Sequence, residues 1–115
     1  MLFRSWLGVD GLGSVIRLVV NGASGPVEIL RAPIQWAAGE WHQVALVWTH
    51  GGPTVLYLDG LAGATGAGLD LRPLEQLAGT PGFCLGSDGR GNRLAQGQFD
   101  ELYTFLRACT AEEVA

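Results

Sequence analysis

Residues Glu40–Thr49 read E-W-H-Q-V-A-L-V-W-T and form the strongest strand signal in the chain. β-Branched and aromatic residues favour strands, and alternate residues of a strand point to opposite faces of a sheet. One face of this predicted strand carries Val44, Leu46 and Trp48. Thr54–Asp59 follows a Gly-Gly-Pro turn, and the dipeptide Asp59-Gly60 then favours a type I′ hairpin turn, which needs positive φ at both central residues. This part of the chain is therefore predicted to form antiparallel strands.

Further strand signals lie on both sides of this segment. Ser14–Asn21 and Val27–Arg31 predict a hairpin, Phe83–Ser87 predicts a short strand, and Gln98–Leu106 predicts a final strand. The Gly-rich stretch between them, Leu61–Gly82, is predicted to be irregular. With 18 glycines among 115 residues, the chain has many sites for tight turns. Short strands separated by frequent turns favour an all-β sandwich or barrel.

The two ends of the chain carry separate local signals. Thr110-Ala111-Glu112-Glu113 has the pattern of a capping box and predicts one short helical turn. Met1–Ser5 (M-L-F-R-S) matches the translation of a common short-read sequencing adapter. We therefore hypothesise that Met1–Ser5 is a non-native segment and that the gene continues upstream, which would explain why no signal peptide is visible.

Composition and charge argue against several classes of function. Hydrophobic residues make up 48% of the chain and charged residues 16%, a profile that is not typical of disordered proteins. The formal net charge is −4, and the seven basic residues are all arginines scattered along the sequence. No basic stripe is present to bind the phosphates of nucleic acid. No apolar run approaches the ~20 residues of a membrane-spanning helix. We therefore expect neither nucleic-acid binding nor membrane insertion.

Five sequence pieces together resemble one known family. They are Gly39–Val47 (G-E-W-H-Q-V-A-L-V), Leu56–Gly60 (L-Y-L-D-G), Phe83–Gly86 (F-C-L-G), Gly97–Phe105 (G-Q-F-D-E-L-Y-T-F) and Arg107–Val114 (R-A-C-T-A-E-E-V). In this order the pieces are similar to the LamG-like jelly-roll domains of the concanavalin A-like lectin/glucanase superfamily. Cys109 departs from the family pattern, which usually has Leu there, and the family's first strands have no counterpart.

The resemblance implies an all-β fold, an antiparallel two-sheet jelly-roll sandwich of the concanavalin A-like kind that is incomplete at the N-terminus. Residues 6–115 would then be a partial LamG-like domain. The motif residues that the resemblance makes structural are Trp41, His42, Tyr57, Asp59, Gly60, Gly86, Asp100 and Glu101. Among them, Trp41 is expected to close the sandwich and Asp100 to make structural backbone contacts.

A glycoside hydrolase site is not predicted. Such a site needs two carboxylates that flank the scissile bond, and on a strand these would occupy alternate positions. Asp100 and Glu101 are adjacent and would face opposite sides of a sheet, while Glu112 and Glu113 belong to the predicted helical turn. The histidines, His42 and His50, lack a nucleophile pattern nearby, so a structural or solvated role is favoured for both.

Ligand-binding candidates lie in two connecting loops. Among the tryptophans, Trp36 lies in a connecting loop and is the candidate for an exposed ring on which a sugar stacks. Asp88, Arg90 and Asn92 form a polar loop, in which Asp88 and Asn92 are the candidate calcium ligands. Because Arg90 places a positive charge between them, a turn held by local backbone bonds is the favoured interpretation. The sequence suggests no cofactor other than calcium.

The resulting functional prediction is a non-catalytic binding or adhesion module of a larger secreted or surface protein of bacterial type. Its partner would be a glycan or an extracellular protein, and covalently linked neighbouring domains are expected. The alternative is an architectural domain without a ligand of its own, beside a catalytic domain such as a glycoside hydrolase. An enzyme would require acids from strands outside this sequence. Cys84 and Cys109 could form a disulfide, but two free thiols are the simpler interpretation.

Overall fold

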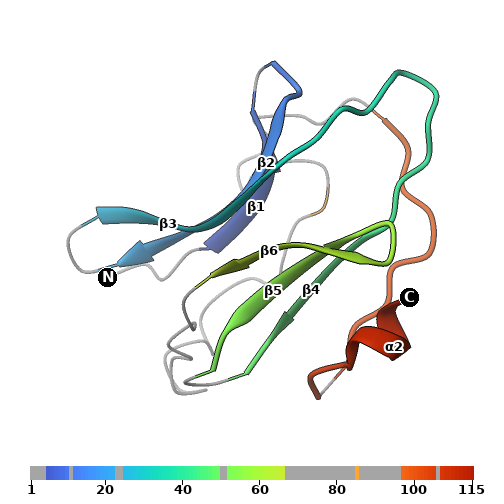
Figure 1. Cartoon of the computed structure of the whole chain (residues 1–115). Coiled ribbons are helices and arrows are strands. Elements are labelled where there is room, and N and C mark those ends of the chain that lie inside the picture. Colours follow the sequence, from blue (N-terminus) through green and yellow to red (C-terminus); the bar gives the residue numbers. More distant parts are fainter. Residues whose placement is uncertain are drawn as a thin grey trace. The chain divides into compact units, whose positions relative to one another are not determined.

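A computed structural model describes residues 5–10, 12–22, 25–49, 52–66, 85, 97–105 and 107–115. The chain divides into two compact units, and all the strands described belong to the first, which comprises Met1–Asp70 and Arg107–Ala115. The second unit is Leu71–Leu106. The sheets and the C-terminal helix of the first unit are drawn in Figure 1.

The first sheet has the strand order β1-β2-β3 and is antiparallel throughout. Its strands are β1 (Ser5–Val9), β2 (Val15–Gly22) and β3 (Gly25–Pro33). The predicted hairpin of Ser14–Asn21 with Val27–Arg31 is confirmed, with β3 longer at both ends. The register shifts between Leu18 and Val19, where β3 contains one extra residue, Ile29. Sequence patterns missed β1, because five residues that include a glycine carry little strand propensity.

The second sheet has the strand order β4-β5-β6 and is also antiparallel. Its strands are β4 (Val44–Trp48), β5 (Thr54–Leu58) and β6 (Leu61–Gly66). Asp59 and Gly60 both have positive φ, 53° and 81°, and connect β5 to β6 as predicted. Leu61–Gly82 was predicted to be irregular, and this prediction is wrong for Leu61–Gly66, which forms β6. The hairpin turn brings these residues beside β5, which supplies a partner strand. The predicted strand Glu40–Thr49 is shortened to β4.

The core lies between the two sheets. The inner faces of β2 and β3 contribute Ile16, Leu18, Leu30 and Ala32, and Ile34 follows directly after β3. From the second sheet, β5 contributes the fully buried Leu56. β3 and β6 approach so closely that a Cβ added at Gly66 would lie 2.3 Å from the carbonyl oxygen of Ile29. Two antiparallel three-stranded sheets around one apolar core confirm the predicted all-β sandwich class.

The edge strands leave part of the inner face exposed. Leu7 and Val9 of β1 pair with Leu18 and Ile16, so they share the core face of the first sheet, yet both are exposed. Val44 and Trp48 of β4 pair with Leu58 and Thr54 and are exposed in the same way. Of Val44, Leu46 and Trp48, which the sequence predicts to share one face, Leu46 alone packs against the core.

The C-terminal segments agree with the sequence patterns in one place and differ in another. The predicted capping box is present at the start of α2 (Ala111–Val114), where the Thr110 and Glu113 side chains bond reciprocally to backbone N–H groups. The predicted strand Gln98–Leu106 is wrong for residues 98–105, none of which is in a strand. Glu101 has φ 56°, and this left-handed conformation interrupts an extended chain. Of Phe83–Ser87, Leu85 alone is described, and Asp88–Asn92 lies outside the described residues.

Candidate functional site

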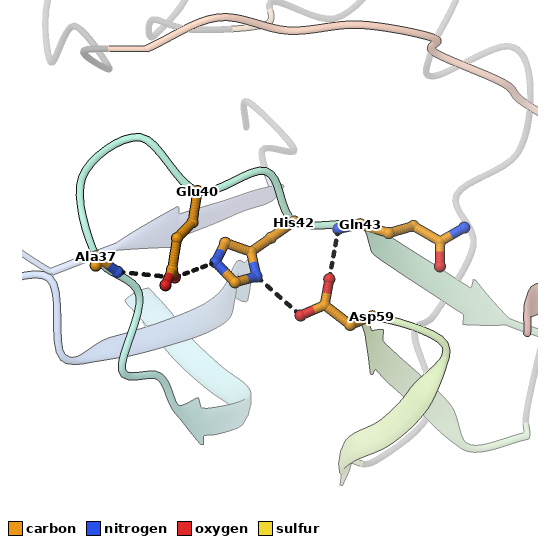
Figure 2. Close-up of polar contacts among 5 residues, drawn as sticks. All are labelled: Ala37, Glu40, His42, Gln43 and Asp59. Atoms are coloured by element: carbon orange, nitrogen blue, oxygen red, sulfur yellow. Dashed lines mark hydrogen bonds and ion pairs between the residues drawn. The ribbon is translucent and has the colours of Figure 1, made fainter.

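The imidazole of His42 lies between two carboxylates (Figure 2). Its Nδ1 is 2.8 Å from Asp59 Oδ2, and its Nε2 is 2.9 Å from Glu40 Oε2. Asp59 comes from the β5–β6 turn, whereas Glu40 and His42 come from the connection between β3 and β4. The His42 side chain is 19% exposed and both carboxylates are about half exposed. We call Glu40, His42 and Asp59 the carboxylate–histidine cluster.

Backbone hydrogen bonds complete this cluster. The backbone N–H of Ala37 donates to Glu40 Oε2 at 3.0 Å, which closes residues 37–40 into a tight turn. The N–H of Gln43 donates to Asp59 Oδ1 at 2.9 Å, and the N–H of Asp59 donates to the Gln43 carbonyl at the same distance. Asp59 therefore binds the backbone just before β4 as well as His42, and Figure 2 shows both of its oxygens in use.

The two tryptophans beside the cluster lie differently from what the sequence suggested. Trp36 is half-buried, packs against the core, and stacks on His42 with ring centroids 4.3 Å apart and an interplanar angle of 11°. It is not the exposed platform that was predicted. Trp41, which was expected to close the sandwich, is 64% exposed. The carboxylate–histidine cluster explains why Trp36 is covered and Trp41 is exposed, because it fixes this segment so that the His42 ring faces Trp36.

Electrostatics favour the charged form of all three groups in the cluster. Hydrogen bonding to Asp59, followed by hydrogen bonding to Glu40, raises the pKa of His42 above its ordinary 6.5 against some desolvation. The backbone N–H of Ala37, followed by the bond to His42, lowers the pKa of Glu40. The bonds to His42 and Gln43 lower the pKa of Asp59. The favoured state is an imidazolium that donates from both nitrogens to two carboxylates.

This arrangement limits the chemistry of the cluster. A histidine with both nitrogens donating has no lone pair for a metal ion or for a proton-abstracting role. The general acid of a glycoside hydrolase needs a raised pKa, whereas the pKa values of Glu40 and Asp59 are both lowered. Among the residues that the structure describes, no group of three or more His, Cys, Asp or Glu side chains is arranged so that it could hold a metal ion. The cluster is therefore built to hold the β3–β4 connection against the β5–β6 turn.

A second polar group lies on the outer face of the first sheet. Arg17 of β2 and Arg31 of β3 are direct partners across the strands. Glu28 Oε1 is 3.1 Å from Arg31 Nε and 3.9 Å from Arg17 Nη1. The Cζ of Arg17 lies 5.2 Å from the ring centroid of Trp6 in β1. Sequence reasoning missed this group, because the pairing register that brings these side chains together is set by the bulge at Ile29.

A family model for the concanavalin A-like lectin/glucanases superfamily matches residues 3–115. The chain belongs to this superfamily. No curated protein matches the chain. Because the name of the superfamily covers both lectins and glucanases, the choice between binding and hydrolysis depends on the side chains of each member.

Among solved structures, this superfamily member is similar to the crystal structure of residues 221–444 of an S-layer domain-containing protein from Clostridium thermocellum ATCC 27405. The two share 21% sequence identity with a TM-score of 0.57. The similarity covers 97% of this chain and 61% of that chain, so the sequence spans less than two thirds of its structural neighbour. At this identity the similarity establishes the fold alone. Within the described residues, no helix is long and apolar enough to cross a membrane.

The other predicted site residues of this superfamily member are dispersed. Tyr57 of β5 is half-buried opposite Ala45, and Gly60 occupies the turn, where the C-terminal Ala115 packs 3.3 Å from the position of an added Cβ. Asp100 and Glu101 are exposed and belong to the second unit. Gly86, Asp88, Arg90 and Asn92 lie outside the described residues, as does Cys84, so the calcium site stays a prediction. Cys109 is a free cysteine, which agrees with the simpler interpretation of two free thiols.

The charge state of His42 leads to a pH-dependent stability. Because folding raises the pKa of His42, its contribution to the free energy of unfolding is fully present below the pKa of the unfolded state, about 6.5. That contribution is lost as pH rises through the pKa of the folded state. The lowered pKa values of Glu40 and Asp59 mean that stabilisation is lost again as pH falls through them. We expect the wild type to melt above His42→Gln by the largest margin near pH 5–6, with a smaller margin at pH 9.

This expectation is checked by thermal melts of both proteins between pH 3 and 9. Proton NMR of a His50→Gln variant, in which His42 is the remaining histidine, measures its pKa directly. A pKa at or below 6.5, or a melting difference that stays constant with pH, would contradict the assigned charge state.

Proposed function

We propose that this chain is a non-catalytic carbohydrate-binding module of a larger cell-surface protein, with Trp41 as the aromatic ring on which a sugar stacks. The observation that carries the proposal is the 64% exposure of Trp41 between two residues, Glu40 and His42, whose side chains are both held in the carboxylate–histidine cluster. An indole ring left in solvent presents a flat apolar face on which a sugar ring can pack, with a polar N–H at its edge. The exposed ring in the proposal is thus Trp41 in place of Trp36.

The carboxylate–histidine cluster supports this role by limiting the mobility of the segment. A ligand that binds a loop must offset the entropy of ordering it, and a loop already ordered avoids most of that cost. Glu40 is tied to Ala37, His42 to Asp59, and Gln43 to Asp59. The Gln43 side chain is exposed and points away from the cluster in Figure 2, and in this proposal its amide bonds a sugar hydroxyl.

The electrostatics support binding over hydrolysis. A hydrolase of this superfamily needs one carboxyl group that stays protonated at working pH and a second that is ionised. In the carboxylate–histidine cluster both carboxylates have lowered pKa values and both are bonded to the same imidazole. Neither is available as a general acid. The cluster therefore favours a structural role for these acids and a binding role for the module.

The structural neighbour supports the location. It is an S-layer domain-containing protein, and this chain spans 61% of its solved length. A module that is covalently linked to further domains and displayed outside the cell is consistent with that similarity. The partner in this proposal is a glycan, and an extracellular protein partner or a purely architectural role is an outcome of the test below.

The test measures retention of the purified chain on uncharged polysaccharides, with calcium and with chelator, after cooperative thermal unfolding has shown that it is folded. We expect saturable binding to at least one polysaccharide without release of reducing sugar. Trp41→Ala should weaken that binding roughly tenfold or more, as expected for an aromatic anchor. Leu61→Ala, an exposed residue on β6, is the matched control and should bind normally.

Three outcomes would overturn the proposal. Release of reducing sugar would make the chain an enzyme. Equal binding by Trp41→Ala and Leu61→Ala would place the sugar elsewhere. A folded wild type that retains no polysaccharide under either condition would favour the architectural or protein-binding function.

A further inference from the structure

Two arginines lie side by side on the outer face of the first sheet. Arg17 and Arg31 are direct cross-strand partners, while their neighbours Ile16, Leu18, Leu30 and Ala32 fill the core on the opposite face. Like charges that face each other across two strands repel. The repulsion is relieved when an anion lies between them, and Glu28 is the carboxylate that approaches both guanidinium groups among the described residues.

Glu28 satisfies little of the hydrogen-bonding capacity of this pair. It accepts one bond from Arg31 Nε at 3.1 Å, whereas its 3.9 Å separation from Arg17 Nη1 is too long for a hydrogen bond. Each guanidinium group has five N–H donors. In the part of the chain that the structure describes, the Arg17 guanidinium donates no hydrogen bond and Arg31 donates one. Their side chains are 40% and 61% exposed, so both arginines are partly accessible from solvent.

Trp6 adds order to the pair. The Arg17 Cζ lies 5.2 Å from the Trp6 ring centroid, a distance at which cation–π attraction orients a guanidinium group. The Trp6 ring also packs over Gly8, since a Cβ added at Gly8 would lie 3.2 Å from its ring atoms. Because Arg17 is the direct partner of Gly8, the ring and the guanidinium are held on adjacent strands of the same face.

We propose that Arg17 and Arg31, oriented by Trp6 and Glu28, bind the oxyanion group of an acidic sugar. The planar donor fork of arginine matches the two oxygens of a carboxylate or a sulfate. The chain as a whole has a net charge of −4 and repels polyanions. The paired arginines form a local positive charge on this face that can attract an anionic group. That the oxyanion belongs to a saccharide rests on the proposed function; the site itself is separate from Trp41.

The test compares polygalacturonate, which carries carboxylates, with dextran sulfate, which carries sulfates, and uses uncharged dextran as the reference. Affinity electrophoresis and calorimetry measure binding by the wild type and by Arg31→Gln. We expect the wild type to bind at least one of the two polyanions more tightly than dextran, and Arg31→Gln to lose about five- to tenfold of that affinity. Arg107→Gln removes an equally exposed arginine at the other end of the chain and is the matched control.

A second variant tests whether the negative charge of Glu28 competes with the ligand. Glu28→Gln keeps a hydrogen-bond acceptor beside Arg31 Nε but removes the competing charge, so it should strengthen polyanion binding. Equal affinities for Arg31→Gln and Arg107→Gln, or no polyanion binding by the wild type, would overturn the inference. Loss of uncharged-glycan binding in Trp41→Ala with no effect of Arg31→Gln would refute this site alone. The reverse pattern would refute the proposed function alone.

Discussion

Replacing Leu56 with alanine is expected to lower the free energy of unfolding by about 2–5 kcal/mol. Leu56 is completely buried at the centre of β5, where the core side chains of the first sheet meet those of the second. Truncation removes the transfer free energy of the lost methyl and methylene groups, and it also leaves a cavity that two hydrogen-bonded sheets cannot readily fill. Against a typical stability of about 5–15 kcal/mol, such a loss is large.

Chemical denaturation measured by tryptophan fluorescence would determine the change for Leu56→Ala. Leu61→Ala provides the control, since Leu61 is 74% exposed on the neighbouring strand and its truncation leaves no cavity. If both variants lost the same small amount of stability, Leu56 would not lie in the core between the two sheets.

Substitution of Gly66 by alanine is expected to cost about 1–3 kcal/mol by overpacking. The added Cβ would lie 2.3 Å from the backbone oxygen of Ile29 and 2.8 Å from its Cγ2. A carbonyl of the strand backbone cannot rotate away as a flexible side chain can, so β3 and β6 would have to separate. Ile29 is the extra residue of the β3 bulge, and this close approach is therefore specific to that point.

The neighbouring outward-facing residue supplies the comparison for Gly66→Ala. Thr65 is exposed and pairs with Val55 on the outer face, so Thr65→Ala should change the unfolding midpoint little. A Gly66→Ala variant as stable as Thr65→Ala would show that the sheets are further apart at Ile29 than the structure indicates.

Local signals in the sequence were sufficient wherever the structure depends on neighbouring residues. The Asp59-Gly60 turn follows from the low cost of positive φ at Asp and Gly, and the Thr110–Glu113 capping box follows from bonds that span three residues. The alternation of Thr54–Asp59 likewise predicted β5. For the carboxylate–histidine cluster, the resemblance identified His42 and Asp59 as motif residues, but nothing local placed Glu40 beside them.

Long-range pairing decided the features that the sequence misassigned. β6 is rich in alanine and glycine and has weak strand propensity, yet it forms because β5 supplies a partner and because glycine permits the close approach to Ile29. The Gln98–Phe105 pattern has strong alternation, yet no strand forms there, and Glu101 adopts positive φ. Alternation indicates which residues could share a face, whereas a strand also needs a partner with free hydrogen-bonding groups.

The sequence by itself determined the all-β class, the hairpin turns and the superfamily, because these depend on side-chain alternation and on backbone preferences of single residues. The tertiary structure alone decided which tryptophan is exposed and which charges meet. Trp36 is covered because His42, held by Glu40 and Asp59, stacks on it, and this leaves Trp41 outside. Arg17 meets Arg31 because a single extra residue sets the register of β3. Both outcomes require contacts between segments distant along the chain, which no local pattern encodes.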